Sequence, residues 1–189
     1  MSTFEYIVGI LSIVLGLALA NLLSTLVETV KYRRTVTHYW VHTLWCAAMV
    51  FNIVGTWWFL WRSMSGTEVV SLPQFSIPIV LTSLQYAISR LLGPDHSLSG
   101  AINLETYFYE IKTPFLICLF GAPIVSMLML PSGDAAGANP ITLLAILASA
   151  LLPLIGIFTA NRRAHAAIVV LWSASYALQE TLQPAVGQL

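Results

Sequence analysis

The chain has 189 residues, of which 58% are hydrophobic and 8% are charged. A water-soluble domain carries roughly a quarter charged residues, so this composition excludes a soluble enzyme or a soluble binding domain. Eight basic and eight acidic residues give a formal net charge of zero, which leaves no field to attract nucleic acid. We therefore expect membrane lipid, and not nucleic acid, to surround the protein.

The apolar residues are gathered in six runs along the chain. A bilayer core about 30 Å thick requires about 20 residues of helix, and these runs are continuous where strands of a membrane barrel would alternate. They predict an all-α fold, a polytopic bundle of six transmembrane helices in a single domain over 1–189. The predicted spans are 6–27, 40–61, 69–92, 113–130, 141–160 and 164–178.

Prolines mark the irregular spans. Pro73 and Pro78 predict a kinked or late-starting third helix, because proline removes a backbone donor and crowds the preceding turn. Pro114 is expected in the first turn of the fourth span, where its missing N–H costs nothing. Pro123 and Pro153 should bend the fourth and fifth helices.

Residues 99–112 are predicted to form a segment at the membrane interface before the fourth span. Tyr107 and Tyr109 stand beside carboxylates there, and tyrosine can keep its ring in lipid and its hydroxyl in water. A solvated loop is the alternative. Glu105 and Glu110 could form ordinary surface ion pairs with the arginines of other loops, namely Arg33, Arg34, Arg162 and Arg163.

The basic residues predict the orientation, because lysine and arginine in short loops stay on the cytoplasmic side. With six spans, the loops after spans one, three and five hold nearly all of them, and the opposite side holds only Arg62. Both termini are therefore predicted to lie outside the cytoplasm. The residues on the predicted cytoplasmic side are Lys31, Arg33, Arg34, Arg90, Lys112, Arg162 and Arg163.

Small residues recur every four positions in the first span, at Ser12, Gly16, Ala20 and Ser24. Such a row lets another backbone approach closely, and helix association in lipid depends on that packing. The row is therefore predicted to meet protein. We favour a helix of the same chain over a second copy as the partner.

Two histidines, His38 and His42, lie one helical turn apart at the cytoplasmic end of the second span. Such a pair could hold a haem or a metal within a bundle. Hydrogen-bonded interfacial histidines are the preferred interpretation, because no further ligands stand at metal-site spacing. No cofactor and no metal site are predicted.

A third set of residues could line a polar path for a small solute. Hydroxyls and amides recur on the second, third and sixth spans, although such side chains more often join neighbouring helices. No charged residue lies in the middle of a span, which argues against an ion-coupled carrier. The members are Asn52, Thr82, Gln85, Ser89 and Tyr176.

No catalytic set is found, so we do not expect an enzyme. The chain lacks a nucleophile elbow, a His-Glu-x-x-His zinc motif, a phosphate-binding glycine loop and paired intramembrane aspartates. Cys46 and Cys118 both stand in apolar runs and are interpreted as small buried hydrophobes.

Several short stretches resemble the opening of small multi-spanning bacterial inner-membrane proteins that have no assigned activity. The resemblance covers about the first third of the chain. It implies a multi-pass protein of the bacterial inner (plasma) membrane, and it carries over no functional residue. The stretches are Phe4-Glu5-Tyr6, Ser12-Ile13-Val14-Leu15-Gly16-Leu17, Tyr39-Trp40-Val41-His42 and Trp57-Trp58.

The function expected from these features is exercised through helix packing, as an oligomer or as an accessory subunit of a larger membrane complex. An oligomeric channel or facilitator for a small solute or ion is the first alternative. A haem- or metal-binding membrane protein that uses His38 and His42 is the second.

Overall fold

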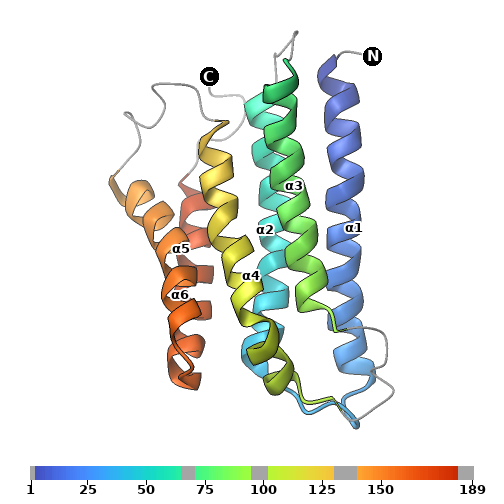
Figure 1. Cartoon of the computed structure of the whole chain (residues 1–189), viewed down its shortest axis with the longest axis vertical. Coiled ribbons are helices and arrows are strands. Elements are labelled where there is room, and N and C mark those ends of the chain that lie inside the picture. Colours follow the sequence, from blue (N-terminus) through green and yellow to red (C-terminus); the bar gives the residue numbers. More distant parts are fainter. Residues whose placement is uncertain (1–2, 65–70, 95–101, 130–139, 183–189) are drawn as a thin grey trace.

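The computed structural model describes residues 3–64, 71–94, 102–129 and 140–182. These residues form an all-α fold with one helix in each predicted region, so the all-α part of the predicted fold class is confirmed (Figure 1). The helices are α1 (Thr3–Lys31), α2 (Trp40–Met64), α3 (Leu72–Leu92), α4 (Leu104–Met127), α5 (Pro140–Phe158) and α6 (Arg162–Thr181).

Four of the described helices, α1 to α4, are long and apolar enough to cross a membrane. This agrees with a membrane protein. The apolar part of α5, Leu143–Phe158, is shorter, and α6 carries two arginines in its first turn. The crossing of α5 and α6 stays a prediction.

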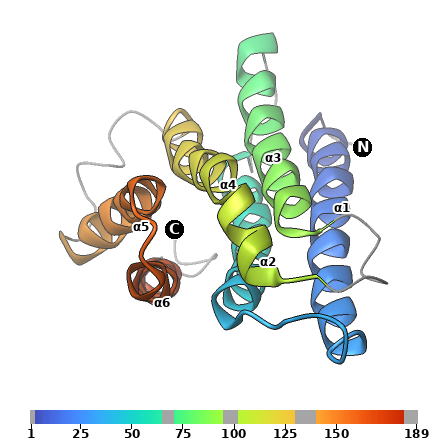
Figure 2. The same ribbon diagram turned by 60° about the horizontal axis from the view of Figure 1, so that its bottom comes forward.

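The helices run up and down in succession, so that the α1–α2 and α5–α6 connections and the start of α4 lie at one end of the bundle (Figure 1). Along one side α3 contacts α1 and α4, and α5 contacts α4 and α6. Behind them α2 contacts α1, α3, α4 and α6, so it is the central helix (Figures 1 and 2). The end with these connections holds the seven basic residues that the sequence places on one side.

One boundary differs from the prediction. α4 begins at Leu104, so residues 104–112 form the first turns of a helix that continues through Pro114. The reason is the Asn103 side chain, whose Oδ1 accepts hydrogen bonds from the backbone N–H groups of Glu105 (2.9 Å) and Thr106 (3.4 Å) and so starts the helix. The location of these first turns at the membrane interface stays a prediction. The remaining part of the predicted segment, 99–101, lies outside the described residues.

The third predicted span starts late, as expected for its prolines. α3 begins at Leu72 and places Pro73 in its first turn, where the missing N–H has no helical partner to lose. The side chain of Gln74 accepts a hydrogen bond from the N–H of Ser71 at 3.0 Å. Residues 69 and 70 of the predicted span lie outside the described residues.

The centre of the bundle is an aromatic cluster where α2, α4 and α6 meet. Trp45 of α2 is fully buried. Its ring centroid lies 5.2 Å from that of Phe115 in α4 and 5.4 Å from that of Trp172 in α6. Burial of large rings supplies much of the packing energy of a core, so this cluster fixes the α5–α6 hairpin to the other four helices.

Candidate functional site

Three members of the predicted small-residue row on α1, Gly16, Ala20 and Ser24, face away from the bundle. The core side of α1 is made by larger residues such as Leu11, Leu15 and Leu22, which are almost completely buried. Gly16 is exposed, and a Cβ added to it would meet no atom within 4 Å. Ala20 and Ser24 are exposed as well.

The expectation that this row packs within the chain is therefore wrong for three of its four members, within the part of the chain that the structure describes. Only Ser12 has a partner on another helix, since its Oγ accepts a hydrogen bond from Trp57 Nε1 at 2.9 Å. The physical reason is that leucines bury more apolar area than glycine or alanine. The neighbouring leucine stripe therefore takes the core side.

The exposed side of α1 forms a distinct surface, which we call the α1 outer face. Gly9 lies about two turns before Gly16 on the same side of the helix, and a Cβ there would also meet nothing within 4 Å. Large aliphatic side chains border the row and are exposed. They are Ile13, Leu17, Leu23 and Val27. A shallow small-residue strip between aliphatic side chains is a surface that a second helix can approach closely.

His38 and His42 have separate partners. The buried His42 ring donates from Nε2 to the carbonyl of Leu92 at 2.8 Å, because a carbonyl can only accept. His38 is exposed, and its Nε2 lies 3.1 Å from Thr43 Oγ1. These are the contacts of hydrogen-bonded histidines, and within the described residues no three His, Cys, Asp or Glu side chains gather as a metal site. The cofactor role of the pair stays a prediction.

Four residues of the predicted polar path are buried inside the bundle, and Tyr176 is half-buried. Thr82 bonds the carbonyl of Pro78 at 3.0 Å, and Ser89 bonds that of Tyr86 at 2.7 Å while lying 3.4 Å from the Asn21 amide. The hydroxyls of Thr82 and Ser89 in α3 therefore both have hydrogen-bond partners within the bundle.

The other members of the path join α2 to α3 on one side and α2 to α6 on another. Gln85 Nε2 donates to Thr56 Oγ1 at 3.0 Å, and the Tyr176 hydroxyl lies 3.5 Å from the carbonyl of Asn52. The side-chain oxygens of Asn52 and Gln85 are buried without a partner among the described residues. A buried acceptor without a donor is costly, so these two oxygens are the members of the path whose hydrogen bonding is incomplete among the described residues.

Gly55 leaves the space that Tyr176 occupies beside α2. The sequence does not indicate this role. Tyr176 packs directly onto the backbone of α2, so that a Cβ added at Gly55 would overlap its hydroxyl and lie 3.3 Å from a carboxylate oxygen of Glu180. Gly55 thus allows the Tyr176 side chain of α6 to lie directly against the backbone of α2. The residues are 121 apart in the chain, and no local pattern links them.

A second polar cluster lies where α4 meets the α5–α6 connection. Lys112 Nζ donates to the carbonyls of Thr159 (2.5 Å) and Ile157 (3.3 Å), and His165 Nε2 donates to the Thr159 carbonyl at 3.1 Å. A cation at the last carbonyls of a helix compensates the dipole and satisfies acceptors that have no helical donor. Lys112 therefore caps α5 from another helix.

Tyr39, just before α2, lies beside this cluster and packs against α4. Burial raises the pKa of Tyr39, so the residue stays a neutral phenol that can donate. Its ring lies 6.5 Å from that of Tyr109, centroid to centroid, and 6.0 Å from the guanidinium of Arg162. The hydroxyls of both tyrosines and Nδ1 of His165 are buried without partners among the described residues.

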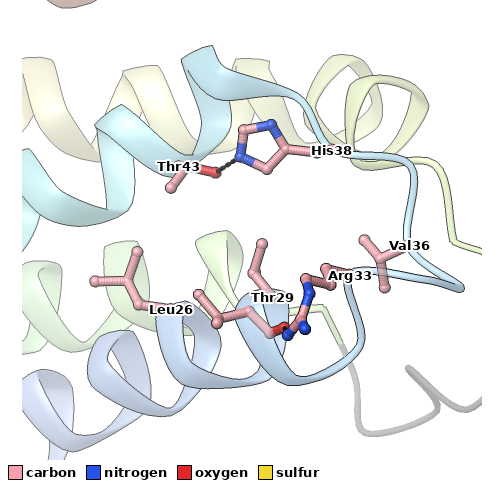
Figure 3. A pocket seen from close by; sticks show the side chains of 7 residues that line it. Leu26, Thr29, Arg33, Val36, His38 and Thr43 are labelled. Carbon is pink, nitrogen blue, oxygen red and sulfur yellow. Dashed lines mark hydrogen bonds between the residues drawn. The ribbon is translucent and has the colours of Figure 1, made fainter.

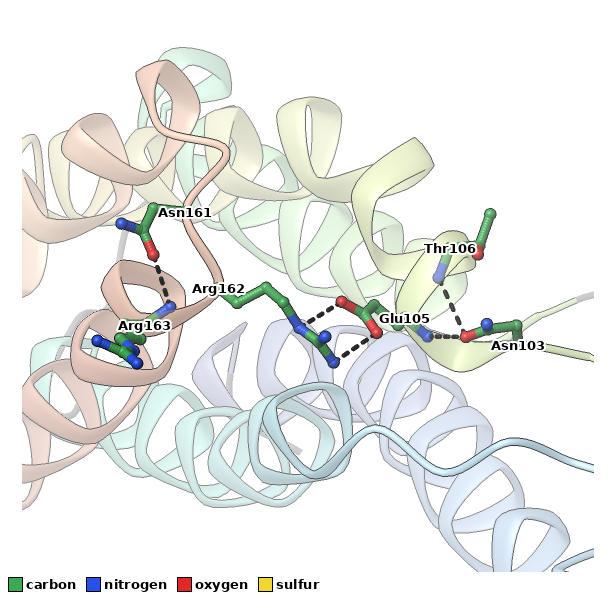
Figure 4. Close-up of polar contacts among 6 residues, drawn as sticks. All are labelled: Asn103, Glu105, Thr106, Asn161, Arg162 and Arg163. Carbon is green, nitrogen blue, oxygen red and sulfur yellow. Dashed lines mark hydrogen bonds and ion pairs between the residues drawn. The ribbon is translucent and has the colours of Figure 1, made fainter.

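Arg162 and Glu105 join α6 to α4 at the edge of this cluster (Figure 4). Two nitrogens of the guanidinium lie 2.6 Å from the two carboxylate oxygens, which is the bidentate arrangement. The pairing that the sequence allowed for Glu105 is confirmed. Each helix also begins at an asparagine cap, since Asn161 Oδ1 accepts from the N–H of Arg163 at 2.9 Å as Asn103 does for α4.

Replacing Lys112 with methionine should destabilise the α4–α5 contact by about 1.5 kcal/mol, because two carbonyls lose a charged donor while the length of the side chain is kept. Thermal unfolding in detergent micelles measures this change. Lys31→Met removes the same charge from an exposed side chain at the end of α1 and is the matched control. Equal stabilities of the two variants would contradict the capping role.

Comparison of the chain with protein-family models, with curated proteins and with solved structures finds no match. The candidate functional site is therefore defined by geometry alone. Its strongest feature is the α1 outer face.

Proposed function

We propose that this chain is a six-span protein of the bacterial inner membrane that acts through helix packing, as a homo-oligomer whose contact is the α1 outer face. Both termini lie outside the cytoplasm. A second copy of the chain is the partner, with α1 packed against α1 about a two-fold axis. The same face would serve an accessory subunit that docks on another membrane protein.

The main support for this proposal is that small residues of α1 lie on the side of the helix that faces away from the bundle. In lipid there is no hydrophobic force between helices, so association depends on close backbone approach. Gly9, Gly16 and Ala20 are exposed, and large side chains would cover lipid equally well. A self-complementary strip also suits a two-fold contact, in which the same surface is used twice.

The membrane placement has its own support. α5 has 19 residues, and at 1.5 Å per residue it is about 28 Å long, which is close to the thickness of a bilayer core. The end of α1, the end of α3 and the start of α6 lie at one end of the bundle (Figure 1), and each of these helix ends carries basic residues. This distribution favours a cytoplasmic location for that end.

Native mass spectrometry of the detergent-purified protein tests the oligomer. We expect a dimer that Gly16→Leu converts to monomer, because the leucine side chain would hold the two backbones apart. Ser83→Leu makes a similar change at an exposed position of α3 and should leave the dimer intact. A strict monomer for the unaltered chain, or equal loss with both variants, would contradict the proposal. Co-purification of a different protein that Gly16→Leu releases would identify the accessory role.

A channel is the second candidate, favoured by the two unpartnered amide oxygens of Asn52 and Gln85. Acceptor groups at that depth can replace part of the hydration shell of a small solute or ion. Flux through liposomes that contain the protein should fall for Gln85→Leu. Unchanged flux would exclude this residue from a conduction path.

A further inference from the structure

A pocket of about 270 Å³ lies between the end of α1 and the start of α2 (Figure 3). Leu26, Val30 and Val36 give it apolar walls. Its polar residues are Thr29, Arg33, His38 and Thr43. The pocket opens to the surface, and Val30 on its rim is exposed, so the apolar walls continue into the side of α1 that faces the surroundings.

The charge of the pocket is positive. The Arg33 guanidinium donates a hydrogen bond from Nη1 to the carbonyl of Val30 at 3.3 Å, and no lining residue is acidic. Within the described part of the chain no carboxylate forms an ion pair with Arg33, whereas Arg162 is paired with Glu105. Arg33 is also exposed. Its positive charge is therefore available to an anion.

The position of the pocket indicates which class of anion it would bind. It lies at one end of α1 and α2, both of which are long and apolar enough to span a membrane, and so at the depth of the lipid headgroups. A free anion would gain nothing from the apolar walls. An anionic phospholipid can use both the positive charge and the apolar walls of the pocket. Its phosphate would contact the Arg33 guanidinium, and the first part of an acyl chain would lie against Leu26 and Val30.

We propose that this pocket binds one anionic phospholipid. Arg33 holds the phosphate. Arginine suits this task because its planar fork matches phosphate oxygens. His38, whose Nε2 lies 3.1 Å from the Thr43 hydroxyl, stands on the opposite side of the pocket (Figure 3) and offers a further polar group there. The inference rests on the membrane placement of α1 and α2 and is independent of the α1 outer face.

Native mass spectrometry with added lipid tests this site. Dioleoyl-phosphatidylglycerol should bind more tightly than dioleoyl-phosphatidylcholine, and Arg33→Ala should weaken phosphatidylglycerol binding about fivefold, the effect of one basic residue near an anionic lipid. Arg34→Ala removes the same charge from an exposed neighbour that does not line the pocket. It should leave the affinity within about twofold of the unaltered protein.

A second variant distinguishes the contribution of the acyl-chain contact from that of the Arg33 charge. Val30→Trp fills the apolar wall and keeps Arg33, so it should also weaken phosphatidylglycerol binding, and inorganic phosphate at equal concentration should not compete. Equal binding of the two lipids, equal loss with Arg33→Ala and Arg34→Ala, or displacement by inorganic phosphate would each overturn the proposal. Lipid binding that survives in the monomeric Gly16→Leu variant would separate this site from the oligomer contact.

Discussion

Replacing Gly55 with alanine should destabilise the bundle by about 3 kcal/mol, the upper part of the range for an overpacked core. The added methyl group would overlap the Tyr176 hydroxyl, and α2 and α6 would have to move apart. The aromatic contacts of Trp172 with Tyr176 and Trp45 lie next to this crossing. Thermal unfolding in micelles, followed by circular dichroism, measures the loss.

The same alanine substitution at Gly121 of α4 is the matched control. A Cβ there would lie 3.8 Å from Leu84 Cδ1, an ordinary contact. Removing glycine from a helix interior gains roughly 0.5–1 kcal/mol, so Gly121→Ala should be neutral or slightly stabilising. A Gly55→Ala variant as stable as Gly121→Ala would show that α6 does not pack closely on α2.

A double variant identifies the atom responsible. Tyr176→Phe removes the hydroxyl, after which the atom nearest to the new methyl group is Cζ of the ring at 3.2 Å, a distance that a small shift of the side chain relieves. Gly55→Ala with Tyr176→Phe should therefore regain most of the lost stability. A double variant no more stable than Gly55→Ala alone would place the conflict elsewhere.

Replacing Trp45 with alanine should cost about 3–5 kcal/mol, the usual range for removing a buried large ring. Trp45 is fully buried between Phe115 and Trp172, so no solvent or lipid can fill the space that it leaves. The α5–α6 hairpin would lose its main contact with α2. Unfolding in micelles and limited proteolysis after α4 should both show the release.

Two further tryptophan variants serve as controls for Trp45→Ala. Trp40→Ala changes a side chain that is 51% exposed, so it should leave the stability nearly unchanged. Trp45→Phe keeps most of the ring packing and removes an indole N–H that is buried without a partner among the described residues. It should be far less harmful than Trp45→Ala. Equal loss for Trp40→Ala and Trp45→Ala would contradict the packing role.

The existence of the six helices follows from the sequence, because each apolar run is long and its ends carry polar or helix-breaking residues. The start of α4 does not follow as simply. Pro114 indicates a first turn when read alone, whereas the cap at Asn103 adds further turns before it. A cap outweighs the local preference of one proline when the preceding residues can also be helical.

The site was predicted in part, for a physical reason. Periodicity finds the row at Gly16 and Ala20, but it does not decide which side of α1 faces the core. A step of four residues turns by about 40° more than a full turn, so the row winds around the helix away from the buried leucines. The contacts of Gly55 with Tyr176 and of Lys112 with Thr159 join distant segments, and no local pattern encodes them.

Cysteine cross-linking in native membranes tests the α1 outer face most directly. In a chain whose Cys46 and Cys118 are replaced by alanine, Ala20→Cys should form a disulfide-linked dimer on mild oxidation, because two-fold packing brings the two copies of this position together. Phe51→Cys, on α2 at a position that is 74% exposed, should stay monomeric. Efficient dimers through residue 51 and none through residue 20 would contradict an oligomer built on α1.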